Sequence, residues 1–114
     1  MDQQKPKKKN LFSSEYTLQL ECIAWFRNEY ERHNKGCIIP VPNELAYKRK
    51  DVIIKYGASD LIIVLPSKVL FIELKIGYNN QQQNQIAFQK LIESLNFEYH
   101  IIKNLETFKK IVAQ

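Results

Sequence analysis

Residues 57–75 read GASDLIIVLPSKVLFIELK, two apolar runs joined by a short turn. The runs at 61–65 and 69–74 are rich in Ile, Leu and Val, and a proline-led turn separates them, which predicts a β-hairpin. Side chains alternate between the two faces of a strand, so Glu73 and Lys75 should emerge on one face and the aliphatic side chains between them on the other.

The hairpin also predicts that two carboxylates face each other. If Pro66 and Ser67 are the central turn residues, Asp60 lies opposite Glu73 with Cβ atoms roughly 5 Å apart, whereas a one-residue slip would place Asp60 on the other face. Carboxylates that close repel each other unless one is protonated or a cation lies between them. Oxygen ligands without His or Cys suit Mg²⁺ or Mn²⁺ rather than zinc.

Lys75 follows on the same face, where it could orient or help deprotonate a water or hold a phosphate oxygen. The alternative is an ordinary solvated ion pair between Glu73 and Lys75 at the end of a strand. The Gly57-x-x-Asp60 spacing and the hairpin geometry favour the metal site over that alternative.

A first helix is predicted over residues 15–32, which lack Gly and Pro and follow a candidate N-cap at Ser13-Ser14. Glu15 falls near the middle of the apolar face and Glu21 on its flank, so Glu15 is the better candidate for a third metal or water ligand. The alternative is that Glu15 merely complements the positive helix N-terminus. The apolar face consists of Leu18, Cys22, Ile23, Trp25, Phe26 and Tyr30.

The middle of the chain is less well defined. Residues 37–43 predict a short strand limited by prolines, residues 44–50 a loop or helical turn, and residues 51–56 a strand or an apolar lead into Gly57. Gly57 is expected to permit a tight bend that aims Asp60. The basic cluster Lys48-Arg49-Lys50 is a candidate phosphate contact, with a solvated loop as the alternative.

After the hairpin, the pattern predicts a turn at 77–80, a helix at 81–95, a strand at 97–102 and a helix at 105–112. Gln81 and Gln85 lie at the edge of the core stripe of the first of these helices. Asn96 suits the left-handed position after its end. The expected core stripes are Phe88, Leu91, Ile92 and Leu95 in the first helix and Leu105, Phe108, Ile111 and Val112 in the second.

Composition predicts one soluble domain. The chain has 114 residues, is 45% hydrophobic and carries a formal net charge of +5. No run approaches the ~20 apolar residues of a membrane span and no signal peptide is visible, so an intracellular protein is expected. Cys22 and Cys37 predict buried thiols rather than a disulfide framework. Residues 1–10 predict a disordered basic tail that either attracts phosphates or only aids solubility, and residues 11–114 a single domain.

Three segments together carry a family resemblance: Gly57-Ala58-Ser59-Asp60, Ile72-Glu73-Leu74-Lys75, and Gln85. They resemble the PD-(D/E)XK nuclease superfamily and, within it, the small standalone VRR-NUC domains of phages and bacteria. One departure is Ser59, where the superfamily's name has proline. The resemblance implies an α/β, restriction-endonuclease-like core with a mixed central β-sheet flanked by helices, in the order αβββαβ plus a C-terminal helix.

The resemblance further implies a divalent-metal-dependent DNA endonuclease, selective for structures such as four-way junctions, that uses Mg²⁺ or Mn²⁺ and no organic cofactor. We expect a homodimer acting on branched DNA in the cytoplasm of a bacterial or phage-infected cell, away from membranes. A noncatalytic nucleic-acid-binding module on the same fold and a structural subunit of a larger assembly are the alternatives. The candidate metal ligands are Asp60, Glu73, the Leu74 carbonyl and Glu15. The candidate catalytic residues are Lys75 and Gln85, together with Asp60 and Glu73, and Gln81 is the fallback for Gln85. The candidate nucleic-acid contacts are Gln19, Lys48, Arg49 and Lys50.

Overall fold

The computed structural model describes residues 6–42 and 57–114, with side chains described from residue 15 onward. The described elements follow the predicted order of helix, three strands, helix, strand and helix, which confirms the α/β fold class. They are α1 (Pro6–Glu29), the short 3₁₀ helix η1 (Glu31–His33), β1 (Cys37–Pro40), β2 (Leu61–Leu65), β3 (Lys68–Leu74), α3 (Gln83–Ser94), β4 (Glu98–Ile102) and α4 (Leu105–Ala113).

The strands of the described residues form one mixed four-stranded sheet in the order β1-β2-β3-β4. The β1–β2 and β2–β3 pairs are antiparallel, whereas β3 and β4 run parallel. Leu65 pairs with Lys68, so Pro66 and Ser67 are the two turn residues, as predicted. Ser67 has a positive φ of 61°, as the second central residue of a type II turn does, a turn in which proline is common at the first. This turn fixes the register of the whole hairpin.

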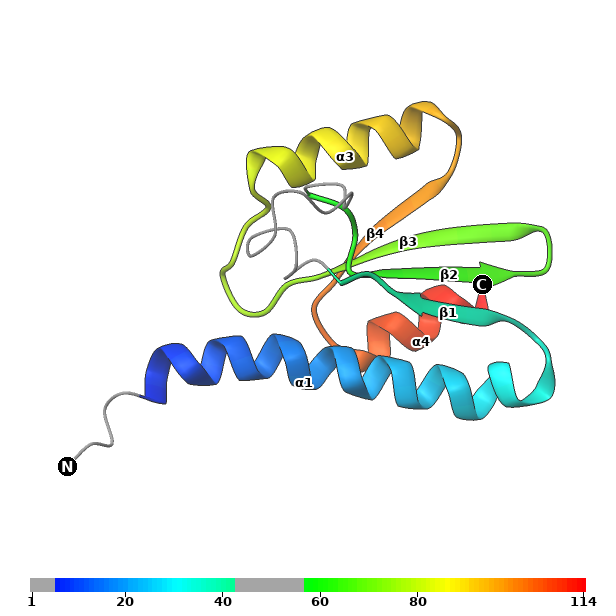
Figure 1. Cartoon of the computed structure of the whole chain (residues 1–114), viewed down its shortest axis with the longest axis horizontal. Coiled ribbons are helices and arrows are strands. Elements are labelled where there is room, and N and C mark those ends of the chain that lie inside the picture. The colour runs from blue at the N-terminus through cyan, green and yellow to red at the C-terminus, as the bar shows by residue number, and fades with distance from the viewer. Residues whose placement is uncertain (1–5, 43–56) are drawn as a thin grey trace.

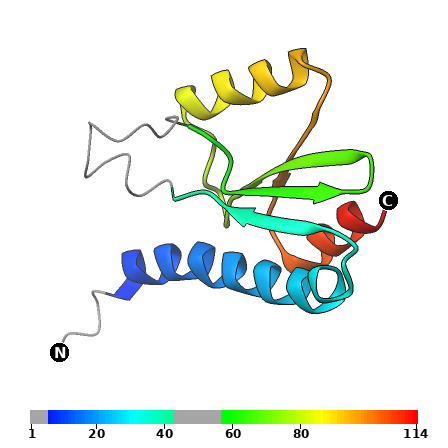
Figure 2. The same ribbon diagram turned by 45° about the vertical axis from the view of Figure 1, so that its right-hand side comes forward.

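Helices cover both faces of the sheet (Figures 1 and 2). The helices α1 and α4 lie together against one face, and α3 lies over the other. The core between the sheet and the pair α1/α4 is apolar, as the pattern of the first and last helices predicted. Its fully or nearly fully buried members are Leu18, Cys22, Phe26, Ile38, Leu61, Ile63, Leu70, Ile72, Leu74, Ile102, Phe108 and Val112.

The first helix begins earlier than predicted. It starts at Pro6 and runs through Ser13 and Ser14, which were expected to cap it, and it ends at Glu29 before the 3₁₀ turn. Proline is tolerated in the first helical turn, and no Gly or later Pro interrupts the segment that follows. Residues 6–10, expected in a disordered tail, are therefore helical, while the division of the chain into a tail and one domain stays a prediction.

Three residues predicted to be buried are exposed instead: Leu91, Leu95 and Cys37. Within α3, Ile92 is buried, but Leu91 and Leu95 are 45% and 55% exposed because the helix lies against the sheet over a narrow stripe. Cys22 is buried as expected, whereas Cys37 is exposed because it begins β1, the edge strand of the sheet. Asn96 does adopt the predicted left-handed conformation after α3, with φ of 71°.

No helix in the described part of the chain combines the length and apolar character needed to cross a bilayer.

Candidate active site

The two candidate metal-binding carboxylates lie at the open end of the hairpin. Leu61 pairs with Ile72, and the next step beyond that pair brings Asp60 level with Glu73. Asp60 Oδ2 accepts a hydrogen bond of 2.7 Å from the Leu74 amide on the opposite strand. Asp60 therefore lies directly beside the backbone that carries Glu73 and the Leu74 carbonyl.

Gly57 supports the segment that leads to Asp60. It has φ of +80°, and a Cβ added there would lie 2.3 Å from the carbonyl oxygen of Asn84. Only glycine combines that dihedral with so close an approach of two backbones. The expected bend is present, and it packs this loop against the first turn of α3.

Ser59, which stands where the superfamily's name has proline, is completely buried between Gly57 and the hairpin. Its hydroxyl donates to the Leu61 carbonyl over 3.3 Å. The polar side chain is thus satisfied locally, and the departure from the family pattern is accommodated without disturbing β2.

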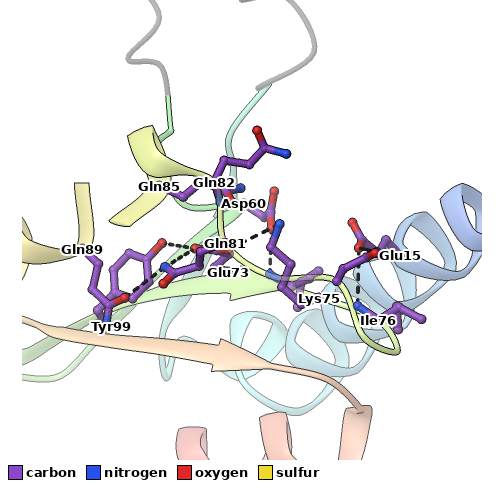
Figure 3. Close-up of polar contacts among 12 residues, drawn as sticks. Glu15, Asp60, Glu73, Lys75, Ile76, Gln81, Gln82, Gln85, Gln89 and Tyr99 are labelled. Carbon is purple, nitrogen blue, oxygen red and sulfur yellow. Dashed lines mark hydrogen bonds and ion pairs between the residues drawn. The ribbon is translucent and has the colours of Figure 1, made fainter. Parts of the chain in front are cut away.

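Glu73 is the most deeply buried carboxylate among the described side chains, at 1% exposure. Its Oε1 accepts hydrogen bonds from the Tyr99 hydroxyl and, over 3.0 Å, from the Gln81 side-chain amide (Figure 3). Its Oε2 has no hydrogen-bond partner among the described residues. Lys75 Nζ lies 3.7 Å from that Oε2 and its side chain is only 11% exposed. Glu73 and Lys75 therefore form a buried pair, and the alternative of a solvated surface pair is wrong.

Tyr99 was not among the residues singled out from the sequence. Burial raises the pKa of Tyr99 well above its usual range, and the hydrogen bond to Glu73 and its negative charge raise it further. The hydroxyl therefore stays protonated and donates to Glu73. A tyrosine on the inward-facing side of a strand is a signal for such a role, because a buried hydroxyl requires a partner.

Of the two candidate glutamines, Gln81 lies just before α3 and Gln85 in its first turn, and their contacts differ. Gln81 donates to Glu73 and also, over 2.9 Å, to the Gln89 side chain. Gln85, the preferred candidate, instead accepts a hydrogen bond of 2.8 Å from the Gln82 amide and so helps to close the first turn of the helix. The structure thus brings the fallback residue, Gln81, to the carboxylate.

Glu15 lies on α1 beyond Lys75, as Figure 3 shows. Its Oε2 accepts from the Asn79 side chain over 3.0 Å and from the Ile76 amide over 3.4 Å. These bonds tie α1 to the loop that follows β3. Glu21 is exposed, in agreement with the choice of Glu15 as the inward-facing acid.

The structure gives little information about the remaining candidate site residues. Lys48, Arg49 and Lys50 lie outside the described residues, so their contact with nucleic acid stays a prediction. Gln19 is half-buried, one helical turn after Glu15. His100 Nε2 lies 3.0 Å from the Glu98 carboxylate.

The oxygen atoms near Asp60 and Glu73 meet some of the requirements of a site for a hard divalent cation. Within residues 15–42 and 57–114, no three His, Cys, Asp or Glu side chains gather into a ready-made metal centre. Glu15 accepts its hydrogen bonds from Asn79 and Ile76, and its role as a third ligand stays a prediction. The buried Oε2 of Glu73, which lacks a hydrogen bond from the described residues, is nevertheless the kind of atom that a cation would satisfy. Together with the Asp60 carboxylate and the Leu74 carbonyl it offers oxygen donors, which Mg²⁺ and Mn²⁺ prefer.

No protein-family model matches the sequence, and no curated protein matches it. Among solved structures, the chain is similar to one described as a "VRR_NUC domain protein", with a TM-score of 0.65. The match covers 89% of this chain and 86% of that chain at 20% sequence identity. The chain therefore has the fold of a VRR_NUC domain protein, an α/β fold with a mixed sheet, as the resemblance in sequence implied.

Proposed function

We propose that the protein is a divalent-metal-dependent DNA endonuclease. Because one fold can host unrelated functions, the proposal rests on the site rather than on the fold alone. The observation that carries it is the buried Oε2 of Glu73, which lacks a hydrogen-bond partner among the described residues and faces Lys75. A buried carboxylate oxygen without a hydrogen bond destabilises a fold, so its position beside a second acid favours a bound cation there.

In this proposal Asp60, Glu73 and the Leu74 carbonyl hold Mg²⁺ or Mn²⁺. A divalent ion, when bound there, stabilises negative charge on the scissile phosphate and lowers the pKa of the attacking water. Lys75 orients that water or binds a phosphate oxygen, since its Nζ lies 3.7 Å from the same Glu73 oxygen. Gln85, whose backbone lies against the Gly57 loop, is the candidate contact to backbone phosphate.

The proposed substrate is branched DNA such as a four-way junction, cut by a homodimer. A chain of 114 residues offers few contacts per subunit, and a two-fold axis would present two sites to one symmetric branched substrate. Light scattering across micromolar concentrations tests the dimer, and a monomer throughout would remove the basis for junction selectivity.

The test of the activity uses end-labelled four-way junction, flap and linear duplex DNA with Mg²⁺, Mn²⁺ or EDTA. Wild type is compared with Lys75→Ala and with Lys90→Ala, which removes an exposed lysine of α3. We expect metal-dependent cleavage that Lys75→Ala abolishes and Lys90→Ala retains. Binding of the junction without cleavage in either metal would instead identify a noncatalytic nucleic-acid-binding module, with Asp60 and Glu73 as structural residues.

A further inference from the structure

The two oxygens of Glu73 have opposite environments. Oε1 accepts two hydrogen bonds, from Tyr99 and Gln81, whereas Oε2 accepts none from the described residues. A carboxylate that used both oxygens on one cation would have to compete with both donors at Oε1. The site therefore favours ligation through Oε2 alone.

Both donors are themselves held in place. Tyr99 is 7% exposed, and its ring packs edge-on against Phe88 of α3 with centroids 6.1 Å apart. The Gln81 amide is anchored by Gln89, whose own amide donates to Glu93 over 3.1 Å. Figure 3 shows Tyr99, Gln81 and Gln89 gathered on the side of Glu73 away from Lys75. This chain of bonds ties the rotamer of Glu73 to α3 and β4.

We propose that Tyr99 and Gln81 are positioning residues that hold Glu73 as a ligand through a single oxygen and thereby select Mg²⁺ or Mn²⁺ over Ca²⁺. This inference rests on the proposed metal site. The smaller Mg²⁺ takes near-octahedral geometry with few carboxylates, whereas the larger Ca²⁺ accepts seven or eight oxygens and commonly binds both oxygens of a carboxylate. Because Tyr99 and Gln81 occupy Oε1, Ca²⁺ binding should be weakened more than Mn²⁺ binding.

The test measures dissociation constants rather than cleavage. Mn²⁺ binding is followed by electron paramagnetic resonance of free Mn²⁺, and Ca²⁺ binding by competition against Mn²⁺, for wild type, Tyr99→Phe and Gln81→Leu. Tyr99→Phe keeps the ring and its contact with Phe88. The matched control is Tyr30→Phe, which removes a hydroxyl from a half-buried ring stacked on Phe26 at the far end of α1.

We expect Tyr99→Phe and Gln81→Leu each to weaken Mn²⁺ binding by up to about tenfold, the effect of losing about 1.4 kcal/mol. The ratio of the Ca²⁺ to the Mn²⁺ dissociation constant should fall at least severalfold in both variants and stay unchanged in Tyr30→Phe. Circular dichroism in EDTA checks that each variant is folded. Gln81→Leu, at a half-buried position just before α3, keeps the test usable if Tyr99→Phe unfolds.

The outcomes separate the two proposals. If wild type binds Mn²⁺ and both variants keep its affinities and its Ca²⁺ to Mn²⁺ ratio, the positioning role is overturned and the metal site stands. If wild type binds no Mn²⁺ at millimolar concentration, the metal site itself fails and the positioning role falls with it.

Discussion

Replacing Lys75 by methionine should destabilise the metal-free protein far more than a surface substitution does. Methionine keeps the length of the buried stem but removes the cation 3.7 Å from Glu73 Oε2. Removing one partner of a buried ion pair costs about 3–5 kcal/mol. Because Oε1 keeps its two hydrogen bonds and Lys75 retains 11% exposure, we expect about 2–4 kcal/mol here. At about 4 °C per kcal/mol for a domain of this size, Tm should fall by about 8–16 °C.

Mn²⁺ should restore much of that loss. In the variant the ion becomes the cation that faces Oε2, and Lys75 no longer repels it. A ligand at 100 times its Kd adds about 2.7 kcal/mol of stability. The increase in Tm on adding Mn²⁺ should therefore be larger in Lys75→Met than in wild type, although cleavage is lost.

Thermal unfolding in EDTA and in Mn²⁺ measures both effects. Trp25, the single tryptophan, reports unfolding because it is half-buried against Phe108 with ring centroids 5.9 Å apart. Lys90→Met is the matched control and should stay within about 0.5 kcal/mol of wild type. A loss that small in Lys75→Met, or a smaller Mn²⁺ effect than in wild type, would refute the reasoning from the buried pair.

Three further predictions follow from single contacts. Gly57→Ala should lose at least about 2 kcal/mol in urea unfolding, because its Cβ would meet the Asn84 carbonyl at a strained φ of +80°; a loss below 0.5 kcal/mol would show that the two backbones separate freely. Native protein at pH 8 should take up one alkyl group by mass spectrometry, at exposed Cys37, since burial raises the pKa of the Cys22 thiol to about 12. Because that folded pKa lies above the unfolded one, the contribution of Cys22 to stability is present below about pH 9 and is lost as pH rises toward 12; rapid double labelling would contradict its burial. Glu15→Gln should bind Mn²⁺ within twofold of wild type, since it keeps an acceptor for the loop after β3, whereas Glu15→Ala should lose about 1 kcal/mol of stability; tenfold weaker binding by the Gln variant would identify Glu15 as a metal ligand.

The sequence predicts the hairpin and its carboxylates because their geometry is local. A two-residue turn sets the register of β2 and β3, and the alternation of side chains then places Asp60, Glu73 and Lys75. The similarity to a VRR_NUC domain protein confirms the fold that these residues implied.

The donors to Glu73 could not be predicted in the same way. Tyr99 reaches Glu73 through the parallel pairing of β3 and β4, in which Phe71 lies level with Tyr99. No turn fixes that register, since a whole helix intervenes, so it depends on how α3 packs. The choice between Gln81 and Gln85 likewise depended on where α3 begins, and boundaries are the least certain part of a sequence pattern.

Alternate residues of β3 point to opposite faces of the sheet and have different roles. Leu70 and Ile72 belong to the apolar core, whereas Glu73 contacts Tyr99 and Gln81 on the side of α3. Substitutions at the core positions should change only the stability of the fold, whereas those on the face of Glu73 should change the proposed metal site as well. A single residue inserted within β3 itself would move the residues on one side of it to the opposite face and affect both properties at once, so the strand tolerates replacement better than insertion.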